Sequence, residues 1–264
     1  DLVKKGLKPY LDALKTLSWE LERTPINRLF ISAHTIYLGT DVPEETFEEI
    51  QRENRKSIDE RPIQMRYFRK VLEMAAKYEV SIVVHEPIKD TGLRRTFPNM
   101  ISREGARGQE FNGFMPIDAH NKPNHTTILP FTRLLSSPMD YTPGIFNLKD
   151  YRYNSQSDRT INKNHHIPST ISKELALYVI IYAPVQMAAD LPSNYEGHPA
   201  FQFILDVPTD WEETIVLNGE IGKYITTVRK DINSDDWFLG SITNEDSRVL
   251  NINLSFLEDG EEYN

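Results

Sequence analysis

VSIVVHEP, residues 80–87, joins a nearly continuous apolar run to an abrupt group of polar residues. A short run rich in β-branched residues is typical of a strand buried on both faces, and such strands belong to parallel sheets. In α/β barrels the catalytic groups lie at the carboxyl ends of the strands. His85 and Glu86 follow the predicted strand directly, so they are the first candidates for a functional site.

The segments around this strand alternate between helical and strand-like patterns. Upstream, RLFIS (28–32) indicates another short buried strand, and the stretch 40–61 is highly charged. Downstream, TTILPF (126–131) predicts a strand, and SKELALYVIIY (172–182) predicts a helix running into a further strand. An amphipathic helix precedes VSIVV, with its apolar stripe at Met65, Phe68, Val71, Leu72, Ala75 and Ala76. This alternation favours an α/β barrel over an α+β fold.

The pattern changes near Trp211, where helices give way to strands and turns. KYITTVRK (223–230), WFLGSIT (237–243) and RVLNINLSFL (248–257) read as strands. Between them, DINSDD (231–236) and TNEDS (243–247) have the composition of turns. We interpret this region as the opening of a separate all-β domain.

Composition excludes several classes of protein. The 264 residues carry a net charge of -9 and no Lys/Arg-rich run, which argues against binding nucleic acid or an anionic membrane. The absence of cysteine excludes disulfides and thiolate chemistry. No apolar run reaches the ~18 residues of a membrane span. The sequence begins inside a helical pattern, so we expect the chain to be part of a longer protein.

The densest group of polar residues lies between His85 and Glu110. It contains Glu86, then Glu104 eighteen residues later and Glu110 six residues after that, among several glycines and arginines. Glycosidic cleavage requires two carboxyl groups, and calcium prefers carboxylate and carbonyl oxygens. Three glutamates at a barrel rim can meet both needs, although each by itself also fits an exposed, salt-bridged carboxylate.

The sequence of this region and of the segments that follow it resembles glycoside hydrolase family 97. The resemblance lies in HEPIKDTGLRRTFPNMISREGARGQEFN (85–112), HTTILPFTRLLSSPMDYTPGIF (125–146) and the segments from 174 to 243. It implies an N-terminal β-sandwich, a (β/α)8 TIM-type barrel and a C-terminal β-sandwich domain. Residues 1–212 then correspond to the later half of the barrel, and 213–264 to the beginning of the last domain. The N-terminal β-sandwich and the first barrel half are expected in the full-length protein.

The resemblance also implies roles for individual residues. It makes Glu110 the general acid, Glu86 the general base and a calcium ligand, Glu104 a calcium ligand, and His85 a contact to the sugar. The implied activity is that of a Ca2+-dependent, exo-acting, inverting α-glucosidase on α-linked oligosaccharides, periplasmic or secreted in a Gram-negative bacterium. Asp140, by its own sequence context, is either a substrate contact or an anchor of the turn before Pro143.

Two alternatives stay open. A retaining α-galactosidase of the same family would need an aspartate at the end of the strand in RLFISAHT (28–35), where this sequence has Ser32, Ala33 and His34. A non-catalytic carbohydrate-binding protein could have kept these barrel loops. The resemblance places a second base and a further calcium ligand before Asp1, so we expect residues 1–264 alone to be inactive.

Overall fold

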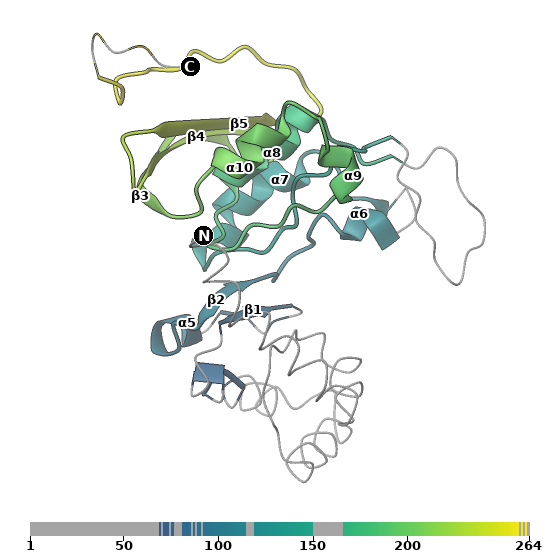
Figure 1. Cartoon of the computed structure of the whole chain (residues 1–264), viewed down its shortest axis with the longest axis vertical. Helices are drawn as coiled ribbons and strands as arrows, with labels where there is room; N and C mark the ends of the chain where they lie inside the picture. The colour runs from purple at the N-terminus through teal and green to yellow at the C-terminus, as the bar shows by residue number, and fades with distance from the viewer. Residues whose placement is uncertain are drawn as a thin grey trace, which may run out of the picture. The chain divides into compact units, whose positions relative to one another are not determined.

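A computed structural model of the chain describes residues 69, 71–73, 75–76, 81–85, 87, 89–90, 92–114, 119–149, 166–258, 260 and 262. The chain forms two compact units, Asp1–Gly105 and Ala106–Asn264 (Figure 1). The predicted strand at 28–32 and the charged stretch at 40–61 lie outside the described residues.

The first unit contains the strand predicted from VSIVV. Strand β1 (Ile82–Val84) pairs in parallel with β2 (Met100–Arg103), and helix α5 (Leu93–Thr96) lies in the connection between them. The buried helical residues Val71, Leu72 and Ala75 pack with this strand, as the apolar stripe predicts. The parallel pairing is therefore confirmed. A closed barrel stays a prediction, because the described residues show only these two parallel strands.

The second unit consists of short helices followed by an antiparallel sheet. Its strands are β3 (Trp211–Glu220), β4 (Tyr224–Asp231) and β5 (Trp237–Thr243), in the order β3-β4-β5. The helices are α6 (Phe111–Phe114), α7 (His125–Ile128), α8 (Ile171–Ile180), α9 (Pro192–Tyr195) and α10 (Phe201–Asp206), with 3-10 turns η2 (Leu129–Phe131) and η3 (Arg133–Leu135). No helix in the described ranges is long and apolar enough to cross a membrane.

The prediction of a strand at TTILPF is wrong, because the segment forms α7 and η2. Thr126 and Thr127 each donate their hydroxyl to a backbone carbonyl three residues earlier, at 3.1 and 2.8 Å. These local hydrogen bonds support a helical turn and override the strand preference of β-branched residues.

The prediction of a strand at the end of SKELALYVIIY is also wrong, because α8 continues to Ile180. Thr170 caps the start of the helix by accepting a hydrogen bond from the backbone N–H of Lys173 at 3.1 Å. Periodicity cannot separate a buried helix from a buried strand when the run is apolar all round. Here Leu177 to Ile180 are all buried, and they remain helical.

The C-terminal antiparallel sheet is confirmed, with two differences in detail. β4 and β5 match the predicted strands, whereas the sequence did not predict β3, which pairs with β4 along most of its length. Residues 248–254 are not a strand: they have no regular structure, and Val249 is 97% exposed. Alternating apolar residues need a partner strand to form a ladder, and β5 pairs with β4 alone among the described strands.

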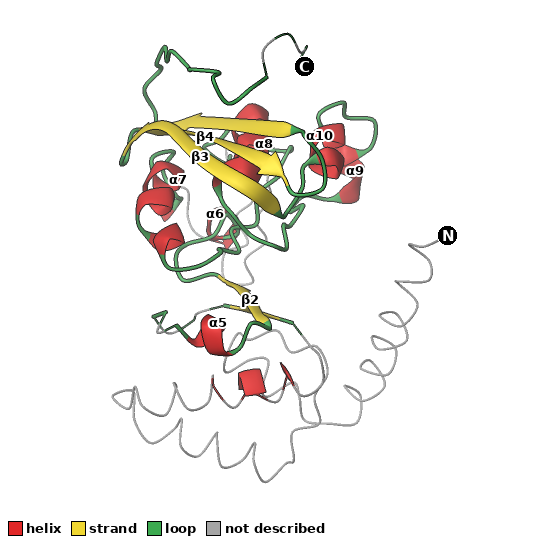
Figure 2. Cartoon of the chain, turned by 90° about the vertical axis from the view of Figure 1, so that its left-hand side faces the viewer, coloured by secondary structure: helices red, strands yellow, loops and turns green. Residues whose placement is uncertain are grey.

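Helix α8 lies against one face of this sheet (Figure 2). Val179 on the helix and Val228 on β4 are both fully buried. At Gly240 on β5, a Cβ atom would lie 2.8 Å from Cβ of Val179, so only glycine allows this close approach. The packing fixes α8, and with it Glu174 on the helix, relative to the rest of the second unit.

Candidate active site

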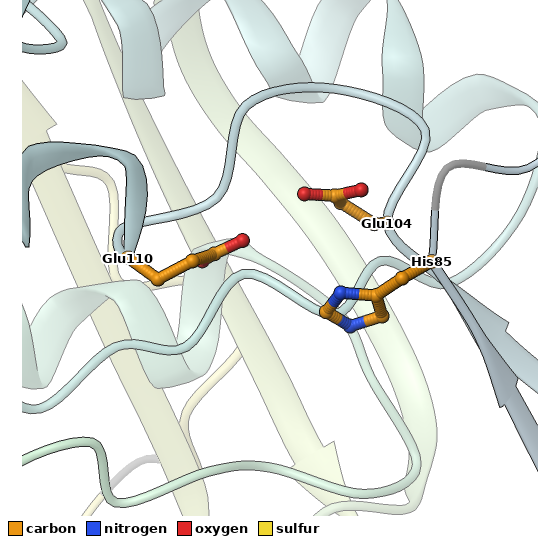
Figure 3. A group of neighbouring side chains, drawn as sticks. All are labelled: His85, Glu104 and Glu110. Carbon is orange, nitrogen blue, oxygen red and sulfur yellow. The ribbon is translucent and has the colours of Figure 1, made fainter. Parts of the chain in front are cut away.

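Two of the predicted site residues follow the paired strands of the first unit. His85 comes directly after β1, and Glu104 comes directly after β2. The backbone N–H of Glu104 donates a hydrogen bond of 2.8 Å to the carbonyl of Val84, so the two residues stand at the same edge of the pair. Both side chains are half-buried and are drawn in Figure 3. His85 has the strand-end position that the sequence predicts, whereas the strand before Glu104 was not predicted. Glu86, the proposed base, lies outside the described residues.

An acidic residue that the sequence analysis did not single out stabilises the loop after β1. The carboxylate of Asp90 accepts hydrogen bonds from the N–H of Gly92 at 2.8 Å and from Nε of Arg94 at 3.3 Å. Burial by itself would raise the pKa of Asp90, but these two bonds and the charge of Arg103 outweigh it and lower the pKa. The Asp90 contacts therefore hold the connection between His85 and Glu104 in shape.

Glu110, the predicted acid, lies in the second unit on the loop before α6 (Figure 3). The hydroxyl of Thr142 donates to Oε2 of Glu110 at 2.7 Å, and the N–H of Glu110 donates back to the hydroxyl oxygen at 3.3 Å. The carboxylate folds over Gly108, where a Cβ would lie 2.8 Å from Cδ of Glu110. Glycine at position 108 is thus required for this orientation of Glu110.

Glu174 on α8 is the most buried acidic group described here, with an exposed fraction of 0%. Its Oε2 accepts hydrogen bonds from Nε2 of Gln109 at 2.5 Å and from the N–H of Gly144 at 2.9 Å, while Ser169 donates its hydroxyl to Oε1 at 2.5 Å. Burial raises the pKa of Glu174 against the lowering effect of these donors. The sequence analysis missed this residue; the signal available was a carboxylate at the start of an apolar helical run, ELALYVII.

Asp140 is 4% exposed and lies in the segment leading to Tyr141 and Thr142. A carboxylate buried to this degree fits the turn-anchoring interpretation better than direct contact with a sugar. Its neighbour Tyr141 is fully buried, and burial together with the charges of Glu174 and Glu110 raises the pKa of its phenol well above the usual value. The substrate-binding role of Asp140 stays a prediction.

The structure thus places the predicted residues in two groups. His85 and Glu104 stand together at the strand ends of the first unit. Glu110 belongs to a hydrogen-bonded group in the second unit that also includes Thr142 and, through Gln109, Glu174. Five residues, GARGQ (105–109), separate Glu104 from Glu110 in the sequence. The hydrogen-bonded group around Glu110 gives its carboxyl a defined orientation, which is what proton transfer requires.

Two family models match the chain. One, described as glycoside hydrolase 97, matches residues 46–106. The other, described as the glycosyl-hydrolase 97 C-terminal region, oligomerisation, matches residues 210–264. The second match covers the antiparallel sheet and the segment after it.

Solved structures and curated proteins agree with these matches. A glycoside hydrolase family 97 enzyme from Pseudoalteromonas sp. strain K8 in complex with acarbose is 50% identical, with a TM-score of 0.63 over 73% of this chain and 29% of that chain. A Glu-to-Gln variant of a family 97 enzyme from the same strain, in complex with panose, is 49% identical, with the same TM-score and coverage. A protein named retaining alpha-galactosidase, from Bacteroides thetaiotaomicron, is 35% identical over 71% of this chain and 27% of its own length.

The chain spans between a quarter and a third of the length of these proteins. The matched regions include His85 and Glu104 at the strand ends and the C-terminal sheet. Taken together, the motifs, the fold and the matches show that the chain belongs to glycoside hydrolase family 97 and corresponds to the C-terminal part of the family's proteins.

Proposed function

We propose that this chain is the C-terminal part of an exo-acting α-glucosidase that uses Glu110 as general acid and inverts the anomeric configuration. The observation that carries the proposal is the held carboxyl of Glu110, which Thr142 and the glycine at position 108 keep in one orientation. A general acid acts only when its proton lies within hydrogen-bond reach of the leaving oxygen, so a fixed orientation is the relevant property.

The reaction divides the work between two carboxyl groups. Glu110 gives its proton to the glycosidic oxygen as the bond from that oxygen to the anomeric carbon breaks. A water molecule attacks the anomeric carbon from the opposite face, and Glu86 takes a proton from that water. His85, at the end of β1, contacts the sugar.

The first unit contains an oxygen donor that fits calcium. Glu104 presents a half-buried carboxylate at the end of β2, which is the ligand type that calcium prefers. An imidazole is a poor ligand for this hard cation, which supports the separate role given to His85. We propose Glu86 and Glu104 as the ligands that this chain contributes; when bound, the ion supplies a fixed positive charge beside the substrate.

The relatives support α-glucosides as the substrate class. The two solved complexes, at 49 and 50% identity, hold panose, an α-linked glucose trisaccharide, and acarbose, an α-linked pseudo-oligosaccharide with an amine in place of one glycosidic oxygen. The relative named retaining alpha-galactosidase is less similar, at 35% identity. The absence of an aspartate in the SAH sequence at 32–34 also favours inversion over retention.

A retaining α-galactosidase is the second candidate function, and the name of the Bacteroides relative is what supports it. The two candidates differ in two measurable properties. They predict opposite anomers of the first product, and they predict different preferences between nitrophenyl α-glucoside and nitrophenyl α-galactoside.

The test uses the complete protein. We expect hydrolysis of nitrophenyl α-glucoside, loss of activity in a chelator, recovery with added calcium, and an inverted first product by NMR. Retention with a preference for α-galactoside would replace the first candidate with the second. Carbohydrate binding without hydrolysis of either substrate would show that the protein is non-catalytic.

A variant at Glu110 tests the acid directly. Glu110→Gln should lose most activity on substrates with poor leaving groups and less on substrates with activated ones, because activated groups need little proton assistance. Glu213→Gln, at an exposed glutamate on β3, is the matched control and should behave as the unmodified enzyme. Equal loss on both kinds of substrate in Glu110→Gln would remove Glu110 from the role of acid.

A further inference from the structure

Thr142 has an unusual backbone conformation. Its φ is 60°, and it is the one residue other than glycine with a positive φ in the described part of the chain. A β-branched residue rarely adopts the left-handed region, because its Cβ substituents crowd the backbone. Strain of this kind persists only where the surrounding structure holds it, and it concentrates at functional sites.

The strained conformation brings the Thr142 side chain to Glu110. Oγ1 of Thr142 lies 2.7 Å from Oε2 of Glu110 and 3.3 Å from the backbone nitrogen of the same residue. One hydroxyl therefore contacts both the carboxyl and the main chain of Glu110. The carbonyl of Tyr141 is a second acceptor, 2.6 Å from the same hydroxyl oxygen. When Glu110 is ionised, its carboxylate is the stronger acceptor of the two, since charge-assisted hydrogen bonds exceed neutral ones. A proton on Oε1 leaves Oε2 as an acceptor for the same hydroxyl.

Buried contacts hold the two segments on either side of this pair. On one side, Gln109 donates its backbone N–H to the carbonyl of Tyr141 at 2.7 Å. On the other, Glu174 accepts from Gln109 and from the backbone N–H groups of Gly144 and Ile145, at 2.5, 2.9 and 3.3 Å. Glu174 comes from α8, whose position the sheet fixes. The residue before Glu110 and the residues after Thr142 are thus joined to one buried carboxylate.

We propose that Thr142 is a positioning residue for Glu110, and that Glu174 holds the segment which keeps Thr142 in place. The hydroxyl donates to Oε2, which assigns the transferable proton of Glu110 to Oε1. A carboxyl that carried its proton on Oε2 would direct it to Thr142 and not to the leaving oxygen. This inference rests on the proposed role of Glu110 as general acid.

The test compares two substitutions at Thr142 in the complete protein. Thr142→Val keeps the size and the β-branching, so the backbone strain is unchanged while the hydroxyl is lost. Thr142→Ser keeps the hydroxyl. Rates are measured on α-glucosides with leaving groups of increasing basicity, from dinitrophenyl to alkyl.

We expect Thr142→Val to lower kcat by about 10–100-fold on alkyl glucosides, a part of what general acid catalysis contributes, and by less than about threefold on dinitrophenyl glucoside. KM should change little on either substrate, because the hydroxyl contacts Glu110 and not the sugar. Thr142→Ser should stay within about threefold of the unmodified enzyme on both, since it keeps the donor. Thr126→Val is the matched control: it removes a buried hydroxyl that donates to Pro123 at 3.1 Å and should leave the leaving-group dependence unchanged.

The outcomes separate this inference from the proposed function. Loss in Thr142→Val that is equal on all leaving groups, or loss in Thr142→Ser as large as in Thr142→Val, would mean that Thr142 is only structural and would overturn the inference. If Glu110→Gln shows the leaving-group dependence and Thr142→Val does not, the positioning role fails while the acid role stands. If Glu110→Gln shows no leaving-group dependence, Glu110 is not the general acid, and the proposed function itself is contradicted.

Discussion

The side-chain amide of Gln109 donates a hydrogen bond of 2.5 Å to the carboxylate of Glu174, a residue 65 positions further along the chain. Gln109 directly precedes the proposed acid, and Glu174 is completely buried on α8. The contact therefore ties a loop of the candidate site to the helix that packs on the C-terminal sheet. Stability of this sheet and orientation of Glu110 should be linked through the same helix.

Glu174→Gln tests this link. The carboxylate accepts from Gln109, Ser169 and the N–H groups of Gly144 and Ile145, whereas a glutamine would turn an NH2 group toward some of these donors. Leaving buried donors unpaired should cost about 1–3 kcal/mol of stability and lower the melting temperature. The control is Glu196→Gln at an exposed glutamate, measured by the same thermal denaturation. An unchanged melting temperature in Glu174→Gln would contradict the importance of these bonds.

Gly144→Ala tests the turn that follows Thr142. Gly144 has a φ of 96°, and a Cβ there would overlap the hydroxyl of Tyr178. Gly197, with a φ of 72° and nothing within 4 Å of such a Cβ, is the matched control. Both alanine variants carry the backbone penalty, so Gly144→Ala should lose about 1–3 kcal/mol more than Gly197→Ala, the typical cost of overpacking. Equal losses in chemical denaturation would show that the Tyr178 contact relaxes without cost.

Gly240→Ala tests the contact between α8 and the sheet. The added Cβ would lie 2.8 Å from Cβ of Val179 and 3.0 Å from the carbonyl of Ala176, and we expect a loss of about 1–3 kcal/mol. Val179→Ala leaves a cavity at a fully buried position and is destabilising by itself. The double variant should lose less than the sum of the two, because shortening Val179 makes room for the new methyl group. Additive losses would mean that the two residues do not compete for the same space.

Lys173 should make the stability of the protein depend on pH. Burial lowers the pKa of its ammonium from 10.5 to about 8, although Nζ donates to the carbonyls of Pro123 and Thr243 at 2.7 and 3.1 Å. Between pH 8 and 10.5 the unfolded chain binds more protons at Lys173 than the folded chain does. Stability should therefore rise with pH across this window, by up to about 3 kcal/mol.

The comparison with Lys173→Met isolates that contribution, since methionine keeps an apolar stem and does not titrate. The melting temperature of the unmodified protein should rise relative to that of the variant as the pH increases from 8 to 10.5. Lys223→Met, at a lysine whose side chain is 52% exposed, is the control and should show no such trend. A constant difference between the unmodified protein and Lys173→Met would show that Lys173 keeps its proton throughout.

Local features of this protein could be predicted from neighbouring residues alone. The β-branched run at 80–84 and the polar residues after it predicted a strand of a parallel pair with His85 at its end, and the alternating segments at 223–243 predicted β4 and β5. The ordered motifs between His85 and Thr243 carried the resemblance to the family. Each of these signals lies within neighbouring residues, where side-chain periodicity and residue type record which face of an element is buried.

Features that depend on distant residues could be seen only in the folded chain. The apolar end of α8 stayed helical, because its packing against the sheet outweighed strand propensity. The contact of Thr142 with Glu110 joins residues 32 positions apart, and that of Glu174 with Gln109 joins residues 65 apart. No periodicity records such pairs: they form when packing brings a strained threonine and a buried carboxylate to one loop, and the orientation of the proposed acid depends on both.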